Sequence, residues 1–403
     1  MEKTQRMTVL WLSFIGFALM FAAWTMFGVL GIPIRKELGL SDMQLAWLSA
    51  LAILNGSLWR LPLGMLADKI GGRKAFLGCL LFSAVASLLV SQSHSYKMLL
   101  ACAVLVGMAG NSFTIGSAWN AAWFPKAQQG FALGLFGAGN VGASVTKLIG
   151  PLLIAAVPAA GMIGGFVPGG WRFVPFLYAC LLLLMALIVS VIAPTPDVIP
   201  NQGRPLRGML RPLHEIRVWR FSLYYTVVFG VYVALSVWLP KYYVDVYDLP
   251  LKKAALMCVP YIFASSLLRP LGGLLSDRFG PRKLTYTVFI VGAIACGALS
   301  FPQGMWPFFW LTLLLGITQG FGKASTIKYI PDYYPRDVGT VVGLVGALAA
   351  LGGFGLPPLF AALKSATGQP QSLFWALLAL TLVSLGWLHA VVVHIHRDEE
   401  HVI

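Results

Sequence analysis

Five basic residues fall inside long apolar segments of the chain, where charged side chains are rare. They are Arg60, Lys147, Arg269, Lys323 and Lys328. None of the 14 Asp and Glu residues falls in the middle of such a segment. A charged side chain within an apolar layer is costly unless it faces a cavity or a partner. This excess of positive charge predicts a binding site for an anion.

Arg60 and Arg269 are the leading candidates because they occupy equivalent places in an internal repeat. Residues 54–77 read LNGSLWRLPLGMLADKIGGRKAFL, and residues 263–286 read FASSLLRPLGGLLSDRFGPRKLTY. Each arginine lies eight residues before an Asp, which is roughly 12 Å along a helix. A planar guanidinium matches a planar oxyanion that accepts two hydrogen bonds side by side. The alternative is a structural role, in which each arginine bonds backbone carbonyls or extends to the membrane surface.

The three lysines add positive charge to the expected cavity. Lys147 shares a helical face with Asn140 and Ser144, at spacings of seven and three residues. Lys323 lies deep in its apolar segment, whereas Lys328 is near the end and could reach the membrane surface. We expect these lysines to supply cavity charge or to carry a coupling proton.

Two glycine-rich segments correspond to each other in the repeat. They read GFALGLFGAGNVGASVTKLIGP (130–151) and GTVVGLVGALAALGGFGLPP (339–358). Glycines three or four residues apart form a flat helix face, which permits close helix packing. A further expectation is that bare backbone approaches a small substrate, with Asn140 as a neutral hydrogen-bond donor. The glycines expected there are Gly137, Gly139 and Gly346.

A loop motif is also repeated, as GMLADKIGGRK (64–74) and GLLSDRFGPRK (273–283). Glycine permits a tight turn, and the Asp can pair with a basic residue or cap a helix. We interpret the motif as a conformational latch rather than a substrate site. Its members are Asp68, Arg73, Asp277 and Arg282.

The elements that position these residues are membrane-spanning helices. Apolar residues make up 58% of the chain and charged residues 11%, against about 25% charged in soluble domains. A span needs roughly 20 apolar residues. Twelve are predicted, near 8–32, 45–67, 75–92, 97–120, 130–158, 172–193, 218–240, 254–276, 284–302, 306–329, 338–363 and 371–393. The expected fold is an all-α integral membrane protein, divided into a six-helix bundle (1–194), a linker (195–217) and a second six-helix bundle (218–403).

The remaining basic residues indicate how the chain crosses the membrane. If the N-terminus is inside, 16 Lys and Arg lie on that side and 8 on the other. The positive-inside rule then predicts that both termini and the linker are cytoplasmic. The net charge of +15 is therefore a topology signal and not a sign of nucleic-acid binding. The five cysteines do not have the spacing of metal ligands, so we expect no metal site. We also expect no cofactor, and a monomer.

The repeated loop motif, the twelve spans and the two similar halves resemble the Major Facilitator Superfamily. The two glycine-rich segments and the paired arginines are similar to the signatures of its nitrate/nitrite porter family. The resemblance implies two six-helix halves related by a pseudo-two-fold axis, with anion binding by Arg60 and Arg269. It also implies an aromatic residue of the fourth span stacked on the anion, here Phe113, and a tyrosine of the seventh span, here Tyr225.

The resemblance further implies secondary transport of nitrate, and of nitrite, across the inner membrane by alternating access. The segment KYIPDYYP (328–335) and the short chain are closer to the branch thought to couple nitrate entry to protons. Lys147, however, stands where an uncharged Gln is expected in many relatives. Nitrate/nitrite exchange and transport of another small anion are the near alternatives. A membrane enzyme or sensor would need a catalytic constellation or a soluble domain, and neither is visible.

Overall fold

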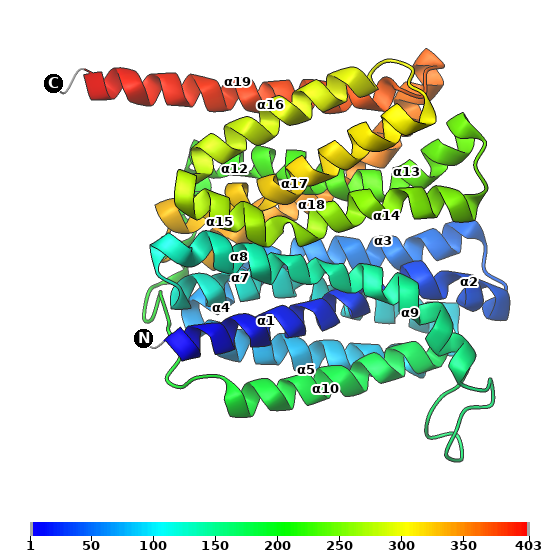
Figure 1. The fold of residues 1–403 in the computed structure, drawn as a ribbon. Helices are drawn as coiled ribbons and strands as arrows, with labels where there is room; N and C mark the ends of the chain where they lie inside the picture. The colour runs from blue at the N-terminus through cyan, green and yellow to red at the C-terminus, as the bar shows by residue number, and fades with distance from the viewer. Residues whose placement is uncertain (1–2, 401–403) are drawn as a thin grey trace. The chain divides into compact units, whose positions relative to one another are not determined.

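The computed structural model describes residues 3–400, and the side chains of all of these except Asp42, Leu251, Lys252 and residues 395–400. The regular secondary structure of this part of the chain is helical (Figure 1), apart from one isolated β-bridge between Met162 and Val167. Ten helical segments within it are long and apolar enough to cross a membrane. An eleventh is added if Met43–Leu58 and Arg60–Ile70, bent by 42°, form one span. The predicted multi-pass, all-α membrane fold is confirmed.

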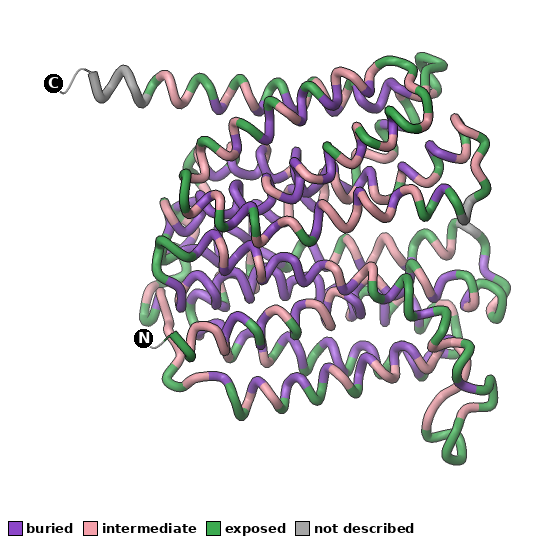
Figure 2. Tube along the Cα trace, in the orientation of Figure 1, coloured by how far each residue is buried: buried purple, intermediate pink, exposed green. Residues whose placement is uncertain are grey.

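The remaining predicted span, 306–329, corresponds to α17 (Met305–Tyr333), a helix of 29 residues. Its apolar character is weakened by Lys323 and Lys328, both of which are buried. Elsewhere many large apolar side chains are exposed, as expected for surfaces that face lipid. Figure 2 shows that exposed and buried residues alternate along many of the helices.

The chain forms two compact units. Unit 1 comprises Met1–Pro125, Leu135–Pro212 and Tyr334–Ala347, and unit 2 comprises Lys126–Gly134, Leu213–Tyr333 and Leu348–Ile403. Two helices, α8 (Gln129–Gly137) and α18 (Val338–Thr367), therefore contribute to both units. The predicted division of the chain at 195–217 stays a prediction, although the first part of that linker belongs to unit 1.

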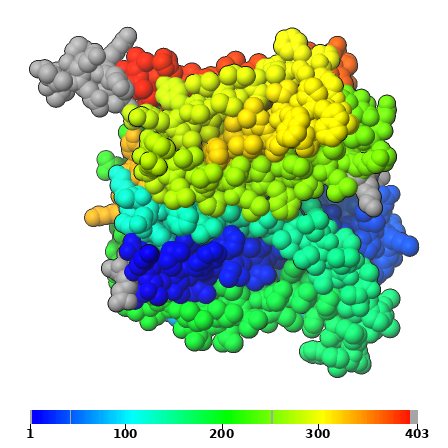
Figure 3. All heavy atoms as spheres, viewed as in Figure 1, coloured from blue at the N-terminus to red at the C-terminus, as the bar shows by residue number. Residues whose placement is uncertain are grey.

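Unit 1 is built on four helix pairings: α5 packs along α10, α3 along α6, and α1 against both α7 and α9. The side chains of α1, dark blue in Figure 3, form part of its surface. The start of α18 packs on α4 so closely that a Cβ atom at Gly64 would lie 2.0 Å from the carbonyl oxygen of Gly339. The helices that lie in this unit alone are α1 (Lys3–Trp24), α2 (Phe27–Leu38), α3 (Asp42–Leu58), α4 (Arg60–Ile70), α5 (Gly72–Ser91), α6 (Tyr96–Gly107), α7 (Ser112–Trp123), α9 (Gly142–Ala156), α10 (Phe173–Ile192) and α11 (Leu206–Met209).

Unit 2 repeats this packing, with α17 against α14, α15 and α16, and α16 against α19. Here the start of α8 packs on α15, and a Cβ atom at Gly273 would lie 2.1 Å from the carbonyl oxygen of Gly130. Both glycine-rich segments thus serve the close packing predicted for them. The other helices of the unit are α12 (Ile216–Tyr225), α13 (Val231–Tyr247), α14 (Leu251–Leu267), α15 (Arg269–Phe279), α16 (Pro281–Leu299), α17 and α19 (Ser372–Glu400).

Several spans are interrupted by short irregular turns. Trp59 separates α3 from α4, and Leu268 separates α14 from α15, with the same backbone angles, φ −83° and ψ −2°. The other interruptions are 3₁₀ turns at Met108–Asn111 and Ala138–Val141 and a π-helical turn at Thr226–Gly230. Turns of these kinds inside helices often mark functional positions.

Candidate functional site

The two predicted arginines have the same backbone setting. Arg60 is the first residue of α4 and Arg269 the first residue of α15, each directly after the one-residue interruption. Both are buried, with 1% of their surface exposed. A helix N-terminus carries partial positive charge, which favours an anion near each guanidinium. Discontinuous spans with this arrangement recur at transporter substrate sites.

In unit 1, the guanidinium of Arg60 is held by backbone carbonyls. Its Nε donates to the carbonyl oxygen of Gly56 at 3.0 Å, and its Nη1 donates to that of Gly346 at 2.9 Å. The group also lies 5.8 Å from the ring centroid of Trp24. A Cβ atom at Gly346 would approach Arg60 Nη1 to 3.0 Å, so this glycine makes room for the guanidinium. These bonds fix the plane of Arg60 and agree in part with the structural alternative.

Two further predicted residues of unit 1, an aromatic ring and an amide, are also buried. Phe113 is buried two residues after the first 3₁₀ turn and stacks on Phe136, with ring centroids 5.9 Å apart. Asn140 lies in the second 3₁₀ turn, is 3% exposed, and has no hydrogen-bond partner for either amide atom among the described residues. Buried amides are normally bonded, so Asn140 is a candidate to bind a ligand.

The remaining unit 1 predictions have different surroundings. Gly139 faces α1, because a Cβ atom there would lie 2.6 Å from the ring of Phe17. Gly137 ends α8. Lys147 is exposed on α9, next to the exposed side chains of Val145 and Leu148. The structure therefore brings Arg60 and Gly346 together and does not group Lys147 with them.

In unit 2, Arg269 lies beside the predicted tyrosine. Its Nη2 donates to Tyr225 Oη at 3.5 Å. Tyr225 precedes the π-helical turn, and its ring stacks on that of Phe229 at a centroid distance of 5.2 Å. The two residues are four positions apart, so both aromatic rings lie on one side of the helix. The structure thus places Arg269 beside Tyr225. The resemblance had implied only that both residues contribute to substrate binding.

Lys323 is fully buried close to this pair, with 0% of its surface exposed. Its Nζ donates to Ser265 Oγ at 2.7 Å and to the Ser265 carbonyl oxygen at 3.1 Å, and it lies 3.2 Å from the ring centroid of Tyr232. None of the ion pairs within the described residues involves Lys323. Its partners are neutral oxygens and a ring face.

Lys328 was expected to add positive charge to the cavity, but in the structure it is paired with carboxylates. Its Nζ lies 3.4 Å from Asp277 Oδ1 and 3.4 Å from Asp332 Oδ1, and it also donates to the carbonyl oxygen of Lys126. Both carboxylates lie near the ends of spans, where the sequence had placed them. We therefore correct its assignment: Lys328 is not unpaired cavity charge but is ion-paired with Asp332 and with Asp277, the residue predicted to act as a latch.

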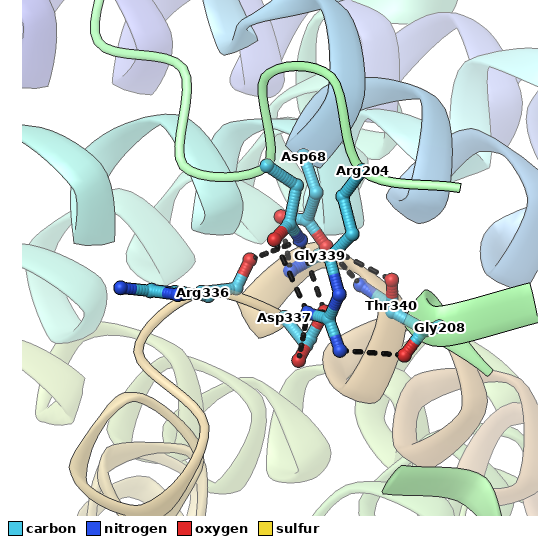
Figure 4. A network of polar contacts seen from close by, with 8 residues as sticks. Asp68, Arg204, Gly208, Arg336, Asp337, Gly339 and Thr340 are labelled. Atoms are coloured by element: carbon cyan, nitrogen blue, oxygen red, sulfur yellow. Dashed lines mark hydrogen bonds and ion pairs between the residues drawn. The ribbon is translucent and has the colours of Figure 1, made fainter. Parts of the chain in front are cut away.

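The latch carboxylates cap helices in a symmetric way. Asp68 accepts hydrogen bonds from the N–H groups of Gly339 and Thr340 at 2.9 and 2.8 Å, at the start of α18 (Figure 4). Asp277 accepts from the N–H groups of Gly130 and Phe131 at 2.9 and 2.8 Å, at the start of α8. Of the two predicted modes, helix capping is the one observed for both.

Sequence reasoning missed the polar contacts of the linker with unit 1. Arg204 forms an ion pair with Asp337 at 2.9 Å, and Asn201 donates to the carbonyl oxygen of Arg336 at 2.6 Å. Arg73 donates through its backbone N–H to Asp197 at 2.8 Å. The sequence shows Asp197 and Asp337 just outside predicted spans, but it does not show which residues they contact.

Comparisons with known proteins agree with the geometry. The family model described as Major Facilitator Superfamily matches residues 12–265 and 252–401. The chain is 57% identical to "Probable nitrate/nitrite antiporter NarK1" of Thermus thermophilus, covering 99% of this chain and 94% of that protein. It is 28% identical to "Nitrite extrusion protein" of Bacillus subtilis (strain 168), covering 94% of each.

The fold also matches solved structures. A crystal structure of the Major Facilitator Superfamily transporter FucP in the outward conformation superimposes with a TM-score of 0.76, covering 93% of this chain and 97% of that chain at 17% identity. At that identity the match supports the fold alone. Together with the family model and the relatives, it identifies a carrier rather than an enzyme. The chain belongs to the Major Facilitator Superfamily and, within it, to the nitrate/nitrite porter family.

Proposed function

We propose that this protein is a secondary transporter of nitrate, and of nitrite, across the cytoplasmic membrane, working by alternating access. The names of its relatives support the substrate class. The observation that carries the proposal is the pair of buried arginines, each at the first residue of a helix after an interrupted span. In this proposal Arg60 and Arg269 both bind the anion, Asn140 donates a hydrogen bond, and Phe113 and Tyr225 contact its faces and edges.

Nitrate fits these groups better than a larger anion does. A planar oxyanion can accept two parallel hydrogen bonds from one guanidinium, and it can stack on an aromatic ring. Phosphate is tetrahedral, carries more charge, and would usually need more donors than two arginines supply. Transport of another small anion is therefore the second choice.

For energy coupling we propose nitrate/proton symport, with Lys323 as the proton carrier. Lys323 is held by Ser265 and by the Tyr232 ring, and the charged residue that acts on it electrostatically is Arg269. An anion at Arg269 would favour the charged form of Lys323, and by linkage a proton on Lys323 would favour anion binding. Anion and proton would then bind and leave together. In nitrate/nitrite exchange, the alternative, no residue needs to change its proton.

The proposal is tested in liposomes that contain the purified protein. We expect labelled nitrate to accumulate when the outside is acidic, and either Arg60→Lys or Arg269→Lys to abolish uptake, because an ammonium cannot reproduce the planar fork. Full transport by both variants would refute the proposed binding residues. Uptake that needs nitrite inside and ignores the pH gradient would refute symport and favour exchange.

A further inference from the structure

The start of α5 in unit 1 holds a carboxylate of the same chain. Asp197 Oδ2 accepts from the backbone N–H of Arg73 at 2.8 Å. Asp197 Oδ1 accepts from the indole N–H groups of Trp119 at 3.2 Å and Trp123 at 2.9 Å. The helix begins just after Gly71, which has φ +93° and ψ 147°. A helix N-terminus and two aromatic donors thus form an anion site, which the linker fills.

Unit 2 repeats these parts. Helix α16 begins just after Gly280, with φ +85° and ψ 143°, and Arg282 stands at the position of Arg73 in the repeated loop motif. The segments AWNAAWFP (118–125) and KYIPDYYP (328–335) both end in an aromatic residue and Pro. Their alignment places Tyr329 and Tyr333 where unit 1 has its two tryptophans. Hydroxyl groups replace the indole donors.

In unit 2 these parts line an open pocket of about 440 Å³. Within the described part of unit 2, no hydrogen bond joins a carboxylate to the N–H of Arg282, in contrast to the bond that Asp197 makes in unit 1. The residues whose charges or donors matter are Lys126, Arg282, Lys283, Tyr329, Asp332 and Tyr333.

The charge and hydrogen bonding of this pocket favour an anionic ligand. Three cationic side chains line it against one carboxylate, Asp332, which is itself 3.4 Å from Lys328 and 4.0 Å from Lys126. Tyr329 is 5% exposed, and its hydroxyl forms no hydrogen bond of ordinary geometry among the described residues; its neighbour, the Thr285 hydroxyl, is already bonded to Pro281 and Ser325. A buried hydroxyl left unbonded in a basic pocket points to a ligand with acceptor atoms.

We propose that this pocket binds a phosphate-type oxyanion, supplied by the headgroup of an anionic phospholipid. The oxyanion would accept from the α16 N-terminus, from Arg282 and from the hydroxyl of Tyr329, and so take the place that Asp197 fills in unit 1. The pocket is lined by the turn between α15 and α16 and by the end of α17, and basic residues at such span ends are where anionic lipid headgroups are expected to bind. Free phosphate shares this chemistry. The inference is independent of the transported substrate.

The test uses the full chain purified in detergent, with the thermal unfolding midpoint as readout. Phosphatidylglycerol, phosphatidylcholine and inorganic phosphate are added separately, with sodium chloride at equal ionic strength as the salt control. We expect phosphatidylglycerol at ten times its dissociation constant to raise the midpoint by roughly 2 °C, and phosphatidylcholine to have no such effect. A shift with inorganic phosphate but not phosphatidylglycerol would keep the oxyanion site and overturn the lipid source.

Variants locate the effect. Lys283→Gln and Tyr329→Phe should each lose most of the shift, since one removes a charge and the other a single hydroxyl. Lys241→Gln, exposed on α13, changes the net charge equally and should keep the shift. A shift that all three variants retain, or no shift with either ligand, would overturn the proposal. Loss of nitrate transport alone would concern the proposed function and not this pocket.

Discussion

Each unit has a buried arginine at the same position in its backbone, but different side chains surround the two arginines. In unit 1, Arg60 is tied to the carbonyl oxygen of Gly346 and lies near Trp24. In unit 2, Arg269 lies beside Tyr225, and the buried Lys323 is bonded to Ser265. The repeat therefore preserves the position of the cation, while the neighbours have diverged. In the proposed mechanism, unit 1 orients an arginine whose charge stays constant, and unit 2 adds Lys323, which can gain or lose a proton.

Neutralising Lys323 should give the largest effect on this comparison. We expect Lys323→Met to abolish accumulation of nitrate driven by a pH gradient, while exchange of labelled for unlabelled nitrate continues, because Arg269 remains. The purified wild-type protein should take up about one proton per nitrate bound in weakly buffered solution, and the variant none. Lys97→Met, at an exposed position of unit 1, is the control. Proton-driven accumulation by Lys323→Met would rule out this residue as the carrier.

The latch aspartates should differ in their contribution to stability. Asp68→Asn weakens bonds to two N–H groups and to Thr340 Oγ1, and we expect it to cost roughly 1–2 kcal/mol. Asp277→Asn also removes a partner of the buried Lys328, so we expect roughly 3 kcal/mol. Chemical unfolding in detergent measures both.

A double variant separates the two contributions at Asp277. Adding Lys328→Met to Asp277→Asn should recover part of the lost stability, because no buried ammonium is then left with a single carboxylate. If Asp68→Asn and Asp277→Asn lose equal stability, and the double variant recovers none of the loss at Asp277, the ion pair contributes nothing beyond the helix cap.

The amide of Asn140 should have a smaller effect, confined to binding. Asn140→Leu keeps the size of the side chain but removes its donor, so we expect the KM for nitrate to rise about tenfold with a similar maximal rate, as for one hydrogen bond to a charged group. The equivalent position in the repeat is Ala349, where Ala349→Gly serves as the control. An unchanged KM in Asn140→Leu would mean that the amide binds water rather than substrate.

The sequence predicted the spans, the repeat and the close packing of the glycine-rich segments because apolar length and glycine spacing are local properties. It did not predict the interruptions at Trp59 and Leu268, since a single residue's backbone angles leave no trace in hydropathy. The pairing of Lys328 with Asp332 was visible as an i, i+4 spacing, but its bond to Asp277 depends on how α15 and α17 pack. The unbonded state of Asn140 likewise depends on packing.

The central claim is that Arg60 and Arg269 both bind the anion, and direct binding tests it most simply. Isothermal titration of nitrate into the purified wild-type protein, Arg60→Lys and Arg269→Lys gives three affinities under one condition. We predict that each substitution weakens binding at least about tenfold, because each removes a charge-assisted bidentate pair. If both variants bind nitrate with the wild-type affinity, the arginines are structural and the account is wrong.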